Sequence, residues 1–554
     1  MEEEVTGREV VSNRKRLGEI LLEKGIVNER HIKVALSIQG STEELKLGEV
    51  LIRMGVVTPR VLGEVLAEQH GMEYADLSIT PPTIEAVKLV PKRLAERYKI
   101  IPIYVDGNKL VIGVTDPNDT TVVDILHRSL NMAIERKLVD IESYTEHFER
   151  VYYFVDKPIE EQIKEIVASS RENRIPQLID LIIQDCIRVR GTDIHLSPTE
   201  YCTLVFFRID GVLNFRYSLP KNMHAGIVSR LKVMSQMDIS KQKVPQDGSF
   251  SYSFLGQEYD MRVSTVPAVN GENVVIRLLN KTSNMLELDY LGFSQDQVQL
   301  IRNLFSLPYG MVLISGPTGS GKTTTLYSAL KELNLLEKNV LTVEDPVEYR
   351  FMLVRQTQLN EEAGYTFNVA GKHFMRQDPD VILIGEIRDP VTAEIAVRAA
   401  VTGHLVLATI HTNDSFSVVS RLFDLGVDPS ILGYALKGVI AQRLVRRTCP
   451  YCRETARYEI PGYGTVQGIK GKGCPSCNNT GYLGRLVISE TLVIDPELSE
   501  MISERKEVIK IRKRAVEKGM KLLFEDGISK VIEKQTTYDE VLRVAGDFVM
   551  LNTR

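Results

Sequence analysis

Apolar residues recur at the same offsets in two neighbouring stretches near the start of the chain. Residues 46–69 repeat the pattern of residues 16–39 with a shift of thirty positions. In each stretch the spacing predicts a short helix, a turn that ends in glycine and a second helix, which begins near Asn28 or Thr58. A helical hairpin duplicated for packing would explain these apolar positions.

The polar ends of the two repeats match as well. Each repeat begins with a basic residue followed by Leu-Gly and ends with glutamine. The matched residues are Arg16, Leu17, Gly18 and Gln39 in the first repeat and Lys46, Leu47, Gly48 and Gln69 in the second. A core does not need these polar residues, whereas a ligand with phosphates and base edges would use them. The repeats therefore predict either a packing unit or a ligand site.

The apolar pattern changes after the repeats. Apolar runs at 100–104 and 109–114 flank Asp106-Gly107 and predict a β-hairpin. Residues 175–284 contain several alternating strands and predict a second α+β unit. We expect an N-terminal domain at 1–155, a charged linker at 156–173 whose pattern is also compatible with a helix, an α+β subdomain at 174–285 and a nucleotide-binding core at 286–554 with a cysteine-rich insert at 449–477.

Composition limits the possible partners of the chain. Its 554 residues suffice for three or four domains, and its 43% apolar and 25% charged residues are typical of soluble globular proteins. The net charge of −5 gives no bulk attraction to nucleic acid or to an anionic membrane. The first residues are acidic, unlike a secretory signal, and no apolar run approaches the roughly 18–20 residues that span a bilayer. We expect no nucleic-acid partner, no membrane span, and a membrane role only through other proteins.

A glycine-rich segment lies between the apolar run 311–314 and a stretch of helical spacing at 323–336. It fits the pattern G-x-x-x-x-G-K-[ST], in which backbone N–H groups at a helix N-terminus surround phosphates. Lys322 would reach the terminal phosphates, and Thr323 would offer a hydroxyl to Mg²⁺. The predicted ATP-binding residues are Gly316, Pro317, Thr318, Gly319, Ser320, Gly321, Lys322, Thr323 and Thr324.

Carboxylates follow two further predicted strands. Glu344 and Glu348 come at the end of the run 340–343, and Glu386 ends the run that begins at Asp380. Phosphoryl transfer needs a metal ion, a carboxylate that orients water, and cations. Glu386 with Glu344 or Glu348 could supply the acidic pair. The sequence does not decide which of them orients water and which serves Mg²⁺.

Two histidines bracket the apolar run 405–410. His404 is predicted equally well as a hydrogen-bonded core residue. His411 lies at the end of the run beside Thr412 and Asn413, where a histidine could sense the terminal phosphate. We therefore take His411 as a candidate site residue.

Four of the six cysteines form two Cys-x-x-Cys pairs. Cys449 and Cys452 precede Cys474 and Cys477 by a spacing typical of a tetrathiolate Zn²⁺ ribbon. A redox dithiol is the alternative, although two paired motifs at this distance are unusual for it. No general base is evident nearby, so we expect a structural metal.

The motifs together resemble one family. Residues 316–323, 344–348, 376–389 and 402–413 look like the Walker A, Asp-box, Walker B and His-box elements of the secretion ATPase superfamily. The chain is similar to its type IV pilus extension and type II secretion branches. This resemblance implies an α/β, RecA-like P-loop ATPase core, a preceding α+β (PAS-like) subdomain, a helical/α+β N-terminal domain and a small zinc ribbon. One departure is Lys372, where the family usually has arginine.

The resemblance also implies roles for residues outside the core. Arg262 and Arg277 match arginines that reach the nucleotide across domains or subunits in relatives, whereas pattern alone would favour strand-surface arginines paired with carboxylates. The repeats at 16–39 and 46–69 resemble the cyclic-di-GMP-binding domain of some pilus and secretion ATPases. Lys46 stands where that domain has arginine, which keeps the charge but loses the planar guanidinium.

The function that the resemblance implies is a motor. It predicts a cytoplasmic homo-hexamer that hydrolyses ATP with Mg²⁺ and drives type IV pilus extension through an inner-membrane platform protein and a cytoplasmic assembly or anchor protein. Such a motor associates with the inner membrane only peripherally. A type II secretion ATPase is the close alternative. A nucleic-acid translocase and a regulatory nucleotide-binding protein without turnover remain rival hypotheses.

Overall fold

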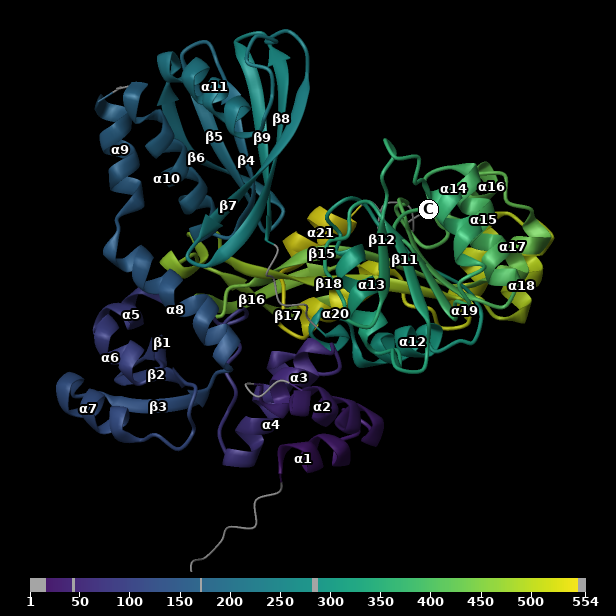
Figure 1. The fold of residues 1–554 in the computed structure, drawn as a ribbon, viewed down its shortest axis with the longest axis horizontal. Coiled ribbons are helices and arrows are strands. Elements are labelled where there is room, and N and C mark those ends of the chain that lie inside the picture. Colours follow the sequence, from purple (N-terminus) through teal and green to yellow (C-terminus); the bar gives the residue numbers. More distant parts are fainter. Residues whose placement is uncertain (1–15, 42–44, 170–171, 281–286, 547–554) are drawn as a thin grey trace, which may run out of the picture. The chain divides into compact units, whose positions relative to one another are not determined.

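The computed structural model describes residues 16–41, 45–169, 172–280 and 287–546 (Figure 1). The chain divides into two compact units, Met1–Tyr152 and Tyr153–Arg554. Within the described ranges, no helix has the length and apolar character that crossing a bilayer requires.

The first unit begins with two helical hairpins. Their helices are α1 (Leu17–Glu23), α2 (Glu29–Ser41), α3 (Leu47–Arg53) and α4 (Pro59–His70). Gly25 and Gly55 follow the first helix of each pair with φ values of 68° and 75°, which glycine adopts at little cost. Thr58 caps α4 by accepting a hydrogen bond from the Val61 backbone N–H at 3.3 Å. The two predicted helix–turn–helix repeats are confirmed.

A small three-stranded layer completes this unit. Its elements are α5 (Ile84–Leu89), α6 (Lys92–Arg97), β1 (Ile100–Asp106), β2 (Lys109–Val114), α7 (Thr121–Leu130), β3 (Ala133–Leu138) and α8 (Ile141–Asp156). β1 and β2 pair antiparallel around Asp106-Gly107, which confirms the predicted hairpin, and β3 joins β2 in parallel.

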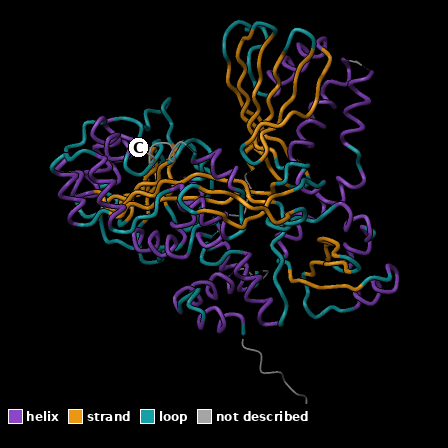
Figure 2. Tube along the Cα trace, turned by 180° about the vertical axis from the view of Figure 1, so that it is seen from behind, coloured by secondary structure: helices purple, strands orange, loops and turns teal. Residues whose placement is uncertain are grey.

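The second unit opens with a six-stranded antiparallel sheet of order β6-β5-β4-β9-β8-β7 (Figure 2). The strands are β4 (Gly191–Pro198), β5 (Cys202–Ile209), β6 (Val212–Pro220), β7 (Gln246–Phe254), β8 (Gln257–Ala268) and β9 (Gly271–Asn280). The helices α9 (Ile159–Ser169), α10 (Ile175–Arg188) and α11 (His224–Met234) share a core with one face of this sheet. The alternate residues of the strands form its open face.

The stretch predicted to be a linker contains a packed helix. Ile159, Ile163 and Ile166 of α9 are buried in the core of the six-stranded sheet domain. Apolar residues at this helical spacing bury one stripe against a neighbour, so the charged composition reflects only the solvent face. Residues 170–171 of the expected linker lie outside the described residues.

A seven-stranded sheet of order β12-β11-β13-β14-β10-β15-β18 forms the larger core. Its strands are β10 (Gly310–Ser315), β11 (Val340–Glu344), β12 (Arg355–Gln358), β13 (Val381–Ile384), β14 (Leu405–Ile410), β15 (Leu436–Thr448) and β18 (Tyr482–Val493). All pairings are parallel except that of β15 with β18. Strands buried on both faces explain the continuous apolar runs in the sequence.

Helices cover both faces of this sheet. Val312 and Ile314 face α12 (Gln295–Phe305) and α13 (Lys322–Lys331), whereas Met311 and Leu313 belong to the opposite core. The helices of that opposite core are α14 (Phe367–Phe374), α15 (Pro390–Val401), α16 (Ser417–Asp424), α17 (Pro429–Ala435), α18 (Pro496–Ser503) and α19 (Val508–Glu517). The predicted helix at 323–336 is shorter than expected, because α13 ends at Lys331.

The remaining elements are short. A two-stranded hairpin of β16 (Arg453–Ile460) and β17 (Gly464–Gly471) lies between β15 and β18 in the sequence. The last helices are α20 (Leu523–Ile532) and α21 (Tyr538–Ala545), and the short 3-10 turns are η1 (Glu172–Arg174), η2 (Lys221–Met223), η3 (Leu288–Tyr290) and η4 (Pro475–Cys477).

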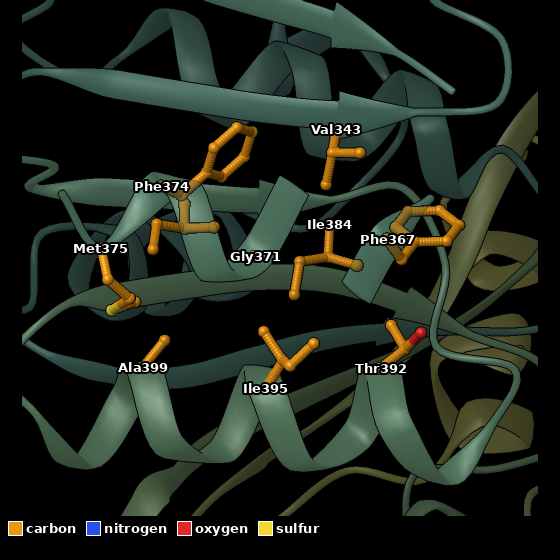
Figure 3. Close-up of a pocket in the computed structure, with 10 residues that line it drawn as sticks. Val343, Phe367, Gly371, Phe374, Met375, Ile384, Thr392, Ile395 and Ala399 are labelled. Atoms are coloured by element: carbon orange, nitrogen blue, oxygen red, sulfur yellow. The ribbon is translucent and has the colours of Figure 1, made fainter. Parts of the chain in front are cut away.

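A small apolar cavity lies where α14 and α15 pack on the seven-stranded sheet (Figure 3). Phe374 and Ile395 line it from the two helices, and Ile384 lines it from β13. Gly371 allows the close approach of the helices, since a β-carbon there would lie 2.5 Å from Ile395 Cγ2. The apolar lining indicates core packing between the two helices.

Candidate functional site

The predicted phosphate loop connects β10 to α13. Gly319 and Gly321 have φ values of 78° and 85°, so L-residues with side chains would be strained there. A β-carbon at Gly316 would lie 2.5 Å from both Ser320 Oγ and the Gln442 carbonyl oxygen. Gln442 also donates from Nε2 to the Ser320 carbonyl at 2.8 Å. The loop is therefore shaped by its glycines and braced from β15.

Lys322 begins α13 and is folded toward the loop. Its Nζ donates to the carbonyl oxygens of Gly316 at 2.8 Å and Pro317 at 3.1 Å. Burial lowers the pKa of Lys322 to about 8, while Glu386 opposes this effect. A phosphate bound in the loop would supply the negative charge that favours the protonated lysine.

Glu386 lies just beyond the carboxyl end of β13, between two cationic or polar partners. His411 Nε2 is 3.1 Å from Glu386 Oε1, and Arg388 Nη2 is 2.7 Å from Oε2. Partial burial and the charge of Lys322 lower the pKa of His411, which favours the neutral imidazole at pH 7. The parallel pairing of β13 with β14 places Glu386 and His411 at the same sheet edge.

Glu344 and Glu348 occupy different environments. Glu344 ends β11 and is buried, with Thr342 Oγ1 donating to its Oε1 at 2.6 Å. Glu348 is exposed. The structure thus brings Glu386 and His411 to Lys322 and encloses Glu344 in the adjacent strand end. The other bracketing histidine, His404, bonds the Ala399 carbonyl at 3.1 Å, as a structural residue would.

The two predicted arginines, Arg262 and Arg277, lie in one row with Arg208 across the open face of the six-stranded sheet. Arg208 pairs in register with Asp193, Asp193 with Arg277, and Arg277 with Arg262. The buried Asp193 carboxylate lies 3.0 Å from Arg277 Nε and 3.6 Å from Arg208 Nε. Arg262 is 3.9 Å from Asp260, and the side chains of Arg262 and Arg277 are 46% and 54% exposed. Both guanidinium groups can therefore reach an anion outside the sheet.

The four paired cysteines converge. Their sulfur atoms lie within 4.8 Å of one another. The separations are 3.8 Å for Cys449–Cys474, 3.9 Å for Cys452–Cys477 and 3.7 Å for Cys474–Cys477. Four thiolates about 2.3 Å from a tetrahedral Zn²⁺ would be about 3.8 Å apart. The cluster fits zinc.

Backbone geometry supports this reading of the cysteines. The backbone N–H groups of Cys474 and Gly481 donate to Cys477 Sγ at 3.2 Å and 3.3 Å. Burial raises the pKa of Cys449, so a bound cation would be needed to keep its thiolate.

The two repeats of the first unit pack on each other reciprocally. A β-carbon at Gly18 would lie 3.6 Å from Leu47 Cδ2, and one at Gly48 would lie 3.6 Å from Leu17 Cδ2. These two equivalent contacts show that the first turns of α1 and α3 pack against each other. Arg16 and Lys46, one before each helix, are exposed. Gln39 donates to the Leu45 carbonyl at 2.9 Å and Gln69 is half-buried.

Sequence reasoning gave no role to three side chains at the candidate site. Arg388 follows Glu386 by two residues, and this proximity could have singled it out. Gln442 contacts the loop from 122 residues away, and Tyr327 bonds Glu344 from α13. Those two contacts depend on tertiary packing, which no local pattern encodes.

Comparisons with known proteins agree with this geometry. Residues 168–543 match the family model of the Type II/IV secretion system protein, and residues 70–156 match that of the MshEN domain. The repeats at 16–69 precede the second match.

Two curated relatives extend over most of the chain. The Type IV pilus assembly ATPase PilB of Myxococcus xanthus is 36% identical over 556 residues, covering 95% of this chain and 98% of the relative. The Type II secretion system protein E of Xanthomonas campestris pv. campestris is 35% identical over 512 residues, covering 87% and 90%.

A solved structure shows the same fold. The Legionella pneumophila ATPase DotB matches with a TM-score of 0.50 and 20% identity, covering 67% of this chain and 96% of that chain. The expected α/β P-loop ATPase fold is confirmed. The chain belongs to the Type II/IV secretion system protein family and is a P-loop ATPase of the kind that serves type IV pilus and type II secretion machines.

Proposed function

We propose that this chain works as a homo-hexamer that hydrolyses ATP to extend a type IV pilus through an inner-membrane platform protein. The convergence of Lys322, Glu386 and His411 at one edge of a parallel sheet supports the hydrolytic site. End-to-end similarity to a pilus assembly ATPase favours extension. A type II secretion ATPase is the second candidate, because a relative from that system also matches both units.

The loop and Lys322 bind the phosphates of ATP in this proposal. Thr323 and Glu386 would hold Mg²⁺, whose oxygen ligands they match, and the ion when bound neutralises charge on the transferred phosphoryl group. Glu386 and His411 orient the attacking water near the terminal phosphate. Arg262 and Arg277 contribute positive charge from the open sheet face, and Glu344 and Glu348 complete the acidic surroundings.

Lys322→Ala tests this site. The variant should lose ATP hydrolysis in a phosphate-release assay, because it removes the buried cation beside the loop. Lys513→Ala, at an exposed lysine on α19, serves as a matched loss of charge in a folded chain. Unchanged turnover in Lys322→Ala would show that hydrolysis takes place elsewhere.

Cyclic di-GMP is the proposed ligand of the repeats. Its two guanylate halves match the reciprocal arrangement of α1 and α3, where Arg16 and Lys46 offer cations. The residues proposed to bind it are Arg16, Leu17, Gly18, Gln39, Lys46, Leu47, Gly48 and Gln69. Isothermal titration should give heat with the dinucleotide and a lower Kd for Lys46→Arg. The absence of binding heat in both the parent and Lys46→Arg would reject cyclic di-GMP as the ligand.

The proposed location is the cytoplasm, peripheral to the inner membrane through the platform protein and a cytoplasmic anchor protein. Replacing the chain by Lys322→Ala in its host separates the two pathways. Loss of pili with normal protein secretion supports extension, whereas loss of secreted proteins with normal pili supports the type II candidate.

A further inference from the structure

A buried tyrosine joins the helix after the phosphate loop to the first of the acids. Tyr327 lies on α13, four residues after Thr323, and its side chain is 3% exposed. Its hydroxyl donates a hydrogen bond to Glu344 Oε2. Burial and the neighbouring Glu344 raise the pKa of Tyr327, so the phenol keeps the proton that it donates.

Glu344 depends on such donors because it is almost fully enclosed. It is 4% exposed, and its Oε1 accepts from Thr342 Oγ1 at 2.6 Å and from Gln356 Nε2 at 3.2 Å. Tyr327 donates to the other oxygen, Oε2. A buried carboxylate oxygen that loses its donor is strongly disfavoured, so the tyrosine fixes the orientation of Glu344.

The hydrogen bond connects two parts of the candidate site. Lys322 and Thr323 form the first turn of α13, which carries Tyr327. Glu344 lies beside Gly385, since a β-carbon there would be 3.3 Å from Glu344 Cα, and Gly385 precedes Glu386. A movement of α13 on phosphate binding would therefore change the position of Glu344, which lies beside the strand end that carries Glu386.

The tyrosine ring is itself held in place. Its centroid is 5.4 Å from that of Phe351 in an edge-to-face contact, and Phe351 is 5.6 Å from Tyr349. This packing holds the ring with its hydroxyl at Glu344 Oε2.

We propose that Tyr327 is a positioning residue for ATP hydrolysis, which orients Glu344 and couples the phosphate-binding helix to the acidic strand end. The inference rests on the proposed function, because it requires Glu344 to contribute to hydrolysis. Tyr327 acts through Glu344 and not on the nucleotide.

Tyr327→Phe tests the proposal in the full-length chain. It should lower kcat about 10- to 100-fold, the effect of losing a donor to a buried charge, and change KM for ATP less than about twofold. Glu344→Gln combined with Tyr327→Phe should lower kcat no further than Glu344→Gln alone.

Tyr217→Phe is the matched control. Tyr217 on β6 donates to the buried Asp185 at 2.6 Å, so the same change removes an equivalent hydrogen bond from the six-stranded sheet. This variant should lower Tm while kcat and KM stay close to those of the parent.

A kcat within about twofold of the parent in Tyr327→Phe would overturn the proposal. If that variant does not fold, Thr342→Val removes one donor on Oε1 and should lower kcat with little change in KM; an unchanged kcat there also overturns it. A Lys322→Ala chain that still hydrolyses ATP would instead refute the proposed site. The two failures are therefore distinguishable.

Discussion

Nucleotide binding should be accompanied by proton uptake at Lys322. Burial lowers the pKa of this lysine to about 8 in the chain without nucleotide. Bound phosphates add negative charge beside Nζ and should raise the pKa back toward its ordinary value. The lysine that was partly neutral then takes a proton from the buffer.

The size of the effect follows from the two pKa values. With a pKa of about 8 before binding, a lysine is about 10% neutral at pH 7, about 50% at pH 8 and about 90% at pH 9. Full protonation in the complex means uptake of about 0.1, 0.5 and 0.9 proton per site. Uptake should therefore rise with pH between 7 and 9.

Isothermal titration of Mg²⁺ and a non-hydrolysable ATP analogue measures this uptake. The observed heat is plotted against the ionisation enthalpy of several buffers, and the slope gives the protons exchanged. Lys322→Arg keeps a cation whose pKa lies far above this range, so its slope at pH 8 should be close to zero. A parent slope that is zero or falls from pH 7 to pH 9 would refute the assignment of Lys322 to the phosphates.

Three further predictions concern other parts of the chain. Arg277→Ala should lower kcat on the order of 10³-fold if Arg277 is an arginine finger. Arg208→Ala removes the other arginine beside Asp193 and should retain most turnover, so equal losses of kcat in the two variants would contradict the assignment. Metal analysis should find one zinc per chain and none in Cys474→Ser, whose Tm should fall; a metal-free parent would contradict the zinc site. Gly371→Ala should lower the free energy of unfolding by about 1–3 kcal/mol in denaturant titration, because its β-carbon meets Ile395, and an unchanged midpoint would show that the helices can separate.

Local patterns were sufficient for much of the fold. The repeats, the hairpin at Asp106-Gly107 and the buried strands each have a periodicity or turn chemistry of their own. The charges of α9 obscured the stripe of isoleucines that the helix buries in the core of the six-stranded sheet domain. The helical spacing of these isoleucines indicates a packed helix, whereas the charged composition of the segment does not.

The candidate site divides in the same way. The spacing of the glycines in the phosphate loop predicts phosphate binding, and the spacing of the paired cysteines predicts metal binding. The partners of Glu386 and the enclosure of Glu344 could not be predicted, because His411, Arg388 and Tyr327 reach them through tertiary packing. Spacing in the sequence identifies the candidate reactive residues, whereas tertiary packing sets the position and orientation of their side chains.

The proposed hydrolytic site is tested most directly by steady-state phosphate release by the purified chain and by Glu386→Gln. The carboxylate between His411 and Arg388 is the proposed centre of hydrolysis. The variant should still bind ATP, because the loop and Lys322 are intact, and should release phosphate at least about 100-fold more slowly. Equal rates in the two proteins would show that Glu386 is not the centre of hydrolysis.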